Sequence, residues 1–209
     1  MSMLFLVFCL FSQSVDTLWT VDFSTTSGDW VAGPQWQWLD DSVYLDIELN
    51  EASCRSGYSS LEDSLVSPNF VVPVTADSLV LVFDHFWWGH GNKHDAAEWS
   101  RSTSSLGLHS SANPTSIVLW EVSGYCGSPW NSDYSQSYSV YDSGYVFVPL
   151  LDVSAGDSLS FVFRGLVETY WYNMNAIAII EWNLYSFSIL NYPYVSLERS
   201  TWGAIKATF

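Results

Sequence analysis

Five side chains in one glycine-rich segment could bind a metal ion. They are Asp84, His85, His90, His94 and Asp95. Neutral imidazoles and carboxylates bind transition metals, and glycines would let the segment fold around one ion. In a strand, however, the neighbours Asp84 and His85 point to opposite faces and cannot ligate the same ion without a bend. The sequence therefore favours ordinary polar loop residues over a transition-metal site.

A second segment carries the carboxylates Asp46, Glu48 and Glu51. Their spacing resembles that of one family of jelly-roll glycosidases, with the first two acids exchanged. Retaining hydrolysis needs two carboxyl groups about 5–5.5 Å apart, and alternate strand positions bring two acids to one face. Asp46 and Glu48 fit equally the solvated face of a strand whose other face is apolar. Glycoside hydrolysis stays an alternative.

Four tryptophans lie in two segments that resemble long loops, residues 87–114 and 124–144: Trp87, Trp88, Trp99 and Trp130. Tryptophan faces stack on sugar rings, and a loop tryptophan has no obvious core to fill. Alternatively, the loops fold back and bury the rings as satellite clusters. We expect the four tryptophans to form a ligand-binding patch that contacts carbohydrate.

Acidic residues at the ends of expected strands could bind calcium, because an extracellular ion prefers hard oxygen ligands. The candidates are Asp40, Asp41, Glu62, Asp63, Asp152 and Asp157. No EF-hand spacing is present. The sequence is compatible with a structural calcium ion, without defining its ligands.

The charge balance narrows the range of partners. The 209 residues carry 6 Lys and Arg against 22 Asp and Glu, a formal net charge of -16. Nucleic acids and anionic membrane surfaces are bound through cationic groups, so neither is an expected partner. Sequence signatures of a nucleophile elbow, a phosphate-binding loop or a dinucleotide site are absent.

The first eleven residues are almost wholly apolar and precede the small residues Ser12 and Ser14. This run is too short to span a bilayer but has the length of a signal-peptide core. We expect a signal peptide over residues 1–14 and a secreted or cell-surface protein without membrane insertion after its removal; a buried N-terminal strand is the alternative. Cys54 and Cys126 could then form one disulfide.

From residue 17 onward, aromatic and β-branched runs alternate with Ser, Gly, Asp, Asn and Pro, which is typical of strands and turns. The expected strands are 18–24, 36–49, 64–72, 78–86, 116–123, 145–151, 158–165 and 176–188. Eight strands without a repeat predict one all-β domain over 15–190, a two-sheet antiparallel sandwich of jelly-roll type. Residues 191–209 are expected to form a strand or linker.

Several short motifs resemble the MAM-like jelly rolls of secreted bacterial surface proteins. They are Leu65-Val66-Ser67-Pro68, Leu79 to His85, Ser116 to Ser123, Gly156 to Phe163 and Asn175 to Glu181. In that family the last motif ends in paired aspartates, where this chain has Ile180-Glu181. The resemblance implies a non-catalytic extracellular adhesion or carbohydrate-binding module. We therefore expect a binding module for a polysaccharide or cell-surface protein; the alternatives are a hydrolase and a structural spacer.

Overall fold

The computed structural model describes residues 15–25, 28–52, 57–76, 78–93, 99–111, 113–126, 136–151, 153–171 and 175–192. These residues form strands and turns. Within these ranges no helix has the length and apolar character needed to cross a membrane. The expected signal peptide, Cys54 and Trp130 lie outside the described residues, so the predicted export and the disulfide to Cys126 stay predictions.

Twelve strands make up the described fold. They are β1 (Asp16–Asp22), β2 (Val31–Ala32), β3 (Trp36–Trp38), β4 (Val43–Ala52), β5 (Gly57–Val66), β6 (Phe70–Val71), β7 (Ser78–Lys93), β8 (Trp99–Ser110), β9 (Asn113–Cys126), β10 (Gln136–Leu150), β11 (Ser158–Trp171) and β12 (Asn175–Tyr192).

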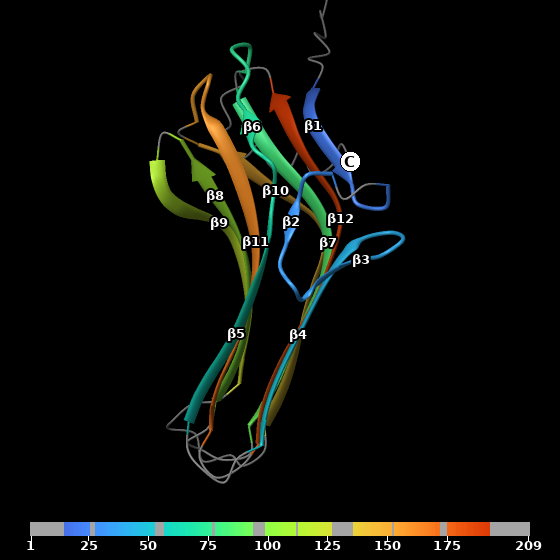
Figure 1. Ribbon diagram of the computed structural model, residues 1–209, viewed down its shortest axis with the longest axis vertical. Coiled ribbons are helices and arrows are strands. Elements are labelled where there is room, and N and C mark those ends of the chain that lie inside the picture. The colour runs from blue at the N-terminus through green and yellow to red at the C-terminus, as the bar shows by residue number, and fades with distance from the viewer. Residues whose placement is uncertain are drawn as a thin grey trace, which may run out of the picture.

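The strands form two antiparallel sheets that pack face to face (Figure 1). One sheet has the order β10-β7-β12-β4-β3, and β1 also pairs with β12; the other has the order β2-β5-β11-β8-β9, and β6 pairs with β11. When the eight long strands are numbered along the chain, the two orders read 6-3-8-1 and 2-7-4-5. This is the jelly-roll arrangement, which confirms the predicted fold class.

Large aromatic side chains fill the space between the sheets. Trp182 and Phe187 from β12, Phe83 from β7, and Phe161 and Phe163 from β11 are fully buried. The rings of Phe163 and Trp182 meet edge to face across the two sheets, with centroids 5.5 Å apart. Burial of such rings supplies much of the stability of a sandwich core.

The prediction of two long loops, at residues 87–114 and 124–144, is wrong. Residues 87–93 continue β7, residues 99–110 form β8, and residues 136–144 begin β10. The inward positions of β8 here are small and polar rather than apolar: Ser100, Ser102 and Ser104 are fully buried. A strand whose buried face is serine lacks the hydrophobic alternation by which strands are normally predicted.

Because these residues are small, side chains of β8 directly contact the backbone of the opposite sheet. The hydroxyl of Ser102 on β8 lies 2.9 Å from the carbonyl oxygen of Ile179 on β12 and 3.2 Å from that of His90 on β7. A side chain at Gly91 would collide with Tyr138 and Ser100. The sheets therefore approach closely at Ser102, where small side chains and hydrogen bonds pack beside the rings of Trp87 and Tyr138.

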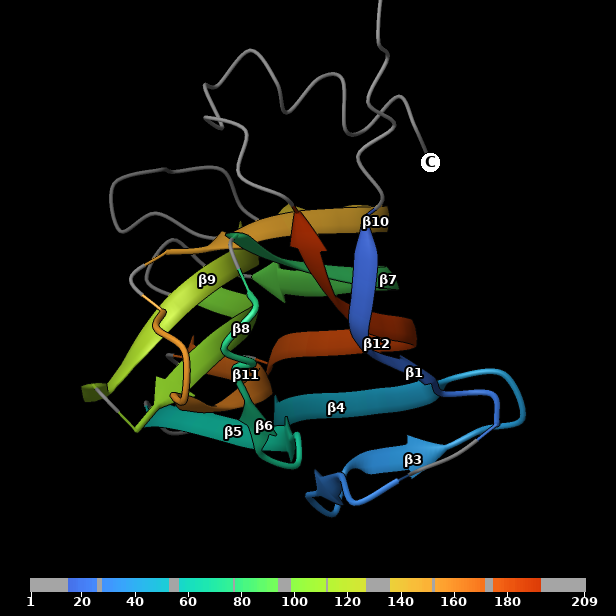
Figure 2. The same cartoon turned by 90° about the horizontal axis from the view of Figure 1, so that it is seen from above.

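The two ends of the described chain lie side by side. Asp16 on β1 is opposite Asn191 on β12, so β1 lies beside the C-terminal end of β12 (Figure 2). Figure 1 shows both at one end of the sandwich. β12 includes the first two residues of the predicted C-terminal segment, Asn191 and Tyr192. The remainder of that segment is outside the described residues.

Candidate functional site

The tryptophans predicted to form one patch lie in separate places. Trp87 points into the core from β7, Trp88 points to the opposite face of the same strand, and Trp99 begins β8 in the other sheet. Trp130 lies outside the described residues. The described tryptophans therefore do not form a single loop patch.

Trp87 is a core residue, and the expectation that it lies in an exposed loop is wrong. Its side chain is 0% exposed, and its indole N–H donates a hydrogen bond to the hydroxyl of Ser104, 2.8 Å away. The indole is thus satisfied inside the protein and offers no surface to a ligand.

Trp99 lies on the outer face of the β5-β11-β8 layer with three tyrosines. This aromatic platform consists of Tyr58, Trp99, Tyr125 and Tyr170. The ring of Trp99 is stacked on that of Tyr170, with a centroid separation of 6.4 Å and an interplanar angle of 14°. Its centroid is also 6.1 Å from that of Tyr58 and 6.3 Å from that of Tyr125. Tyr58 and Tyr125 are more than half exposed, so the platform is open to solvent.

Strand pairing brings the platform together. Tyr170 on β11 is opposite Tyr58 on β5 and Trp99 on β8, while Tyr125 on β9 is opposite Arg101 on β8. Residues at these matched positions share one face of a sheet. Four strands thus contribute one aromatic ring each to the same surface.

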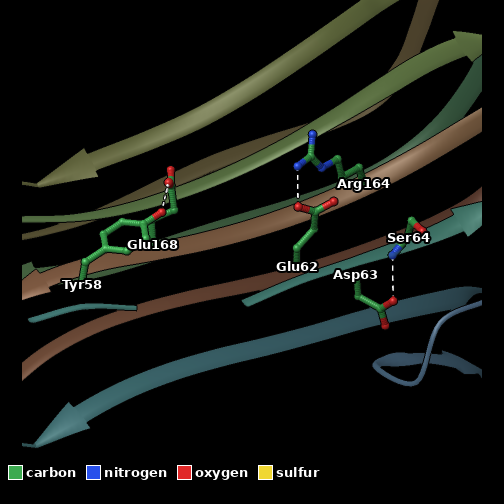
Figure 3. Close-up of polar contacts among 6 residues, drawn as sticks. All are labelled: Tyr58, Glu62, Asp63, Ser64, Arg164 and Glu168. Carbon is green, nitrogen blue, oxygen red and sulfur yellow. Dashed lines mark hydrogen bonds and ion pairs between the residues drawn. The ribbon is translucent and has the colours of Figure 1, made fainter. Parts of the chain in front are cut away.

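A hollow of about 470 Å³ opens beside the platform and is lined by Trp99, Arg101, Ser123, Tyr125 and Glu168. Its polar groups include a guanidinium donor, a carboxylate acceptor and a hydroxyl. The hydroxyl of Tyr58 donates a hydrogen bond to Glu168, 2.6 Å away (Figure 3). This hydrogen bond raises the pKa of Tyr58 and fixes the orientation of the carboxylate. The hollow combines flat rings with a few oriented polar groups, as small-molecule sites do.

Sequence reasoning found Trp99 but missed its three tyrosine neighbours. Tyr170 lies just beyond the expected strand at residues 158–165, and Tyr58 and Tyr125 lie outside the expected strands. Continuing the alternation of β11 from Arg164 through Glu168 would have placed Tyr170 on the outer face. The strand order that unites the four rings is a tertiary property that no local pattern contains.

The histidine and aspartate segment does not form a described metal site. Asp84 faces outward and His85 inward, as expected for neighbours in a strand, and His90 faces outward. His94 and Asp95 lie outside the described residues. Among the described residues, no three His, Cys, Asp or Glu side chains gather in a way that could hold a metal ion.

The calcium candidates mostly have other partners. Asp63 accepts hydrogen bonds from the backbone N–H groups of Gln35 and Ser64, Asp157 accepts one from that of Ser154, and Glu62 pairs with Arg164. Asp152 lies outside the described residues. A structural calcium ion stays a prediction without an assigned location.

The outer face of the other sheet carries a second surface, formed by Trp88 with Tyr44, Asp46 and Glu181. Asp46 on β4 and Trp88 on β7 are both opposite Glu181 on β12. Burial, and then the charge of Asp46, raise the pKa of Glu181. Burial and both carboxylates raise the pKa of Tyr44 to about 12. The ring of Trp88 is stacked on that of His90, with a centroid separation of 5.5 Å.

Comparison of the sequence with known protein families and with curated proteins finds no match. The fold and its surface therefore define the class: a jelly-roll β-sandwich with an aromatic hollow on one sheet. The structure confirms only the fold that the MAM-like resemblance implied. Membership of that family stays a prediction.

Proposed function

We propose that this protein is a non-catalytic binding module that recognises carbohydrate through the aromatic platform. The observation that carries the proposal is the exposed group of four rings centred on Trp99, beside a hollow with Arg101 and Glu168. Sugar rings have apolar C–H faces that stack on aromatic rings, and their hydroxyls both donate and accept hydrogen bonds. The platform offers partners for both kinds of contact.

We also propose that the protein carries an export signal and acts outside the cell. Insoluble and cell-surface polysaccharides are the partners it implies, and a protein partner at the cell surface is the competing one. The proposed mechanism is surface recognition without bond cleavage.

The direct test measures retention of the purified protein on cellulose, chitin, xylan and β-1,3-glucan, with calcium present. We expect retention on at least one polymer and a loss of about tenfold to a hundredfold in affinity for Trp99→Ala, because truncating an aromatic anchor costs about 2 kcal/mol or more. Trp88→Ala, on the outer face of the other sheet, is the matched control, and this variant should still be retained on the polymer. If no polymer retains the protein, a structural or protein-contacting role replaces this proposal.

Glycoside hydrolysis is the second candidate, and one relationship favours it. Asp46 and Glu181 are opposite each other, and burial raises the pKa of Glu181, which is the direction that a general acid requires. This reaction would release reducing ends from a retained polymer. Glu181→Gln would abolish that release without affecting retention.

A further inference from the structure

A second hollow lies on the same outer face as the aromatic platform. It has a volume of about 320 Å³, and its lining includes Glu62, Ser105, His109 and Arg164. Gly107 forms part of its floor, where a Cβ atom would lie 3.1 Å from the hydroxyl of Ser116. Because Gly107 lines the hollow, a side chain at this position would occupy part of it and crowd Ser116.

The two hollows are aligned along the strands. β8 contributes Arg101 to the first and Ser105 to the second, while β11 contributes Glu168 to the first and Arg164 to the second. Each pair is four residues apart on one strand, which is about 13 Å at about 3.3 Å per residue. Figure 3 shows the Tyr58–Glu168 and Glu62–Arg164 contacts in succession along β5 and β11, with Asp63 turned to the opposite side.

Along β8 and β11 themselves, the outward residues between the hollows are uncharged, while Glu62 on β5 is opposite Leu166 and Glu121 on β9 is opposite Ser105. Thr103 on β8 and Leu166 on β11 are opposite each other here. Thr103 is short and 93% buried, and its hydroxyl lacks a hydrogen-bond partner among the described residues. A ligand chain that follows β8 and β11 would therefore pass over Thr103 and Leu166 between the hollows, with the charged Glu62 on one side and Glu121 on the other.

Both arginines along this path are paired with carboxylates. Arg164 pairs with Glu62, and Arg101 lies 3.8 Å from Glu121. An anionic polymer would meet no unpaired cation from these arginines and would be repelled by the formal net charge of -16. An uncharged polyhydroxyl chain, in contrast, is not repelled. The paired arginine and glutamate side chains present oriented donors and acceptors to its hydroxyl groups.

We propose that the two hollows form one path, and that its ligand is an extended, uncharged polysaccharide lying parallel to β8 and β11. This inference depends on the proposed function and specifies its ligand class and binding direction. The aromatic platform would hold one part of the chain, and the Arg164–Glu62 pair would hydrogen-bond a part several sugars further along. A disaccharide is too short to reach both.

The test uses calorimetric titration of the full chain with cello-oligosaccharides, xylo-oligosaccharides and β-1,3-gluco-oligosaccharides of two to six sugars. We expect affinity for at least one series to rise about tenfold or more between the disaccharide and the hexasaccharide, since several hydrogen bonds are added. Replacing Arg164 and Glu62 together by alanine should remove that gain and leave disaccharide binding unchanged. Trp99→Ala should weaken binding at every length.

The outcomes separate the two proposals. Binding that is equally strong at two and six sugars, or a length dependence that survives the double substitution, overturns the path alone. Tighter binding of polygalacturonate than of every neutral series overturns the assignment of an uncharged ligand. Absence of binding to all these sugars overturns both the path and the carbohydrate-binding function. Because Arg164 and Glu62 are solvent-exposed on the sheet face, thermal unfolding should confirm that the double variant remains folded.

Discussion

The indole N–H of Trp182 donates a hydrogen bond to Nδ1 of His85, 3.2 Å away, inside the sandwich. The two residues come from adjacent strands of one sheet, and His85 is 1% exposed. Since Nδ1 accepts this bond, the neutral histidine carries its proton on Nε2, which has no hydrogen-bond partner among the described residues. The carboxylate of Asp142 on β10 lies 3.9 Å from Nε2. His85 is thus built into the core as a neutral ring.

This burial predicts a loss of stability on acidification. Burial lowers the pKa of His85 to about 4, against an opposing effect of Asp142. The unfolded chain binds a proton near the ordinary pKa of about 6.5, so stability is full above that pH and falls as pH decreases toward 4, by about 3 kcal/mol in total.

The measurement compares the free energy of unfolding of the native protein and His85→Gln between pH 7 and pH 4. The difference between the two should shrink or reverse as pH falls, because glutamine can accept the Trp182 hydrogen bond but does not titrate. Asp142, Asp84 and Glu181 are retained in both proteins, so their titration cancels. Parallel curves would contradict a depressed pKa at His85.

Trp87→Ala should destabilise the protein by about 3–5 kcal/mol, the usual cost of removing a buried tryptophan. It also leaves the Ser104 hydroxyl without its indole donor. Urea unfolding of this variant and of Trp88→Ala provides the check, with a clearly smaller loss expected for the half-buried Trp88. Similar losses would contradict the opposite orientation of the two neighbours. Because this variant is expected to be destabilised, reduced polymer retention by Trp87→Ala would not show that Trp87 contacts the ligand.

Ser102→Leu should cost about 1–3 kcal/mol or more, because a larger side chain must enter a tightly packed space between the sheets. It also removes the hydroxyl that lies against the Ile179 carbonyl. Chemical denaturation gives the free energy, and Ser60→Leu on the exposed outer face of β5 is the control, with an expected change within about 0.5 kcal/mol. Equal effects at the two sites would show that the sheets do not approach closely at Ser102.

Glu48→Gln should leave both polymer retention and stability unchanged, within about 0.5 kcal/mol for the latter. Glu48 is exposed on the outer face of β4, in the sheet opposite to the aromatic platform. Parallel assays of retention and of reducing-end release distinguish binding from catalysis. Loss of a measurable hydrolytic activity, with retention intact, would favour the glycosidase alternative.

The fold class could be predicted from the sequence because the core strands alternate in the ordinary way. Leu79, Leu81 and Phe83 point inward on β7, and Phe161 and Phe163 do so on β11. The same reasoning correctly placed Asp46 and Glu48 on the solvated face of β4, opposite Leu45 and Ile47. On β4 one face of the strand contacts the core and the other contacts water, so the hydrophobic pattern follows the strand period. On β7 the outward Val80 and Val82 are also buried, in a second cluster with Leu190.

The prediction of the candidate site was weaker for two physical reasons. Ser100, Ser102 and Ser104 alternate with period two, but their burial follows from close sheet packing, which hydrophobicity does not report. The platform joins Tyr58 to Trp99 through the intervening Tyr170, so it depends on the strand order of the folded sheet. An aromatic residue suggests stacking from the sequence alone. Which residues lie beside it in the folded sheet depends on how distant strands pair.

The pairing of β1 with the end of β12 also determines how the module would be presented. The described ends lie near Asp16 and Asn191, whereas the platform includes Tyr170, next to the opposite end of β12. The described part of the chain therefore begins and ends at the pole away from the aromatic rings. A tether continuing from that pole would leave the sheet face that carries the platform open to the approach of a bulky polymer.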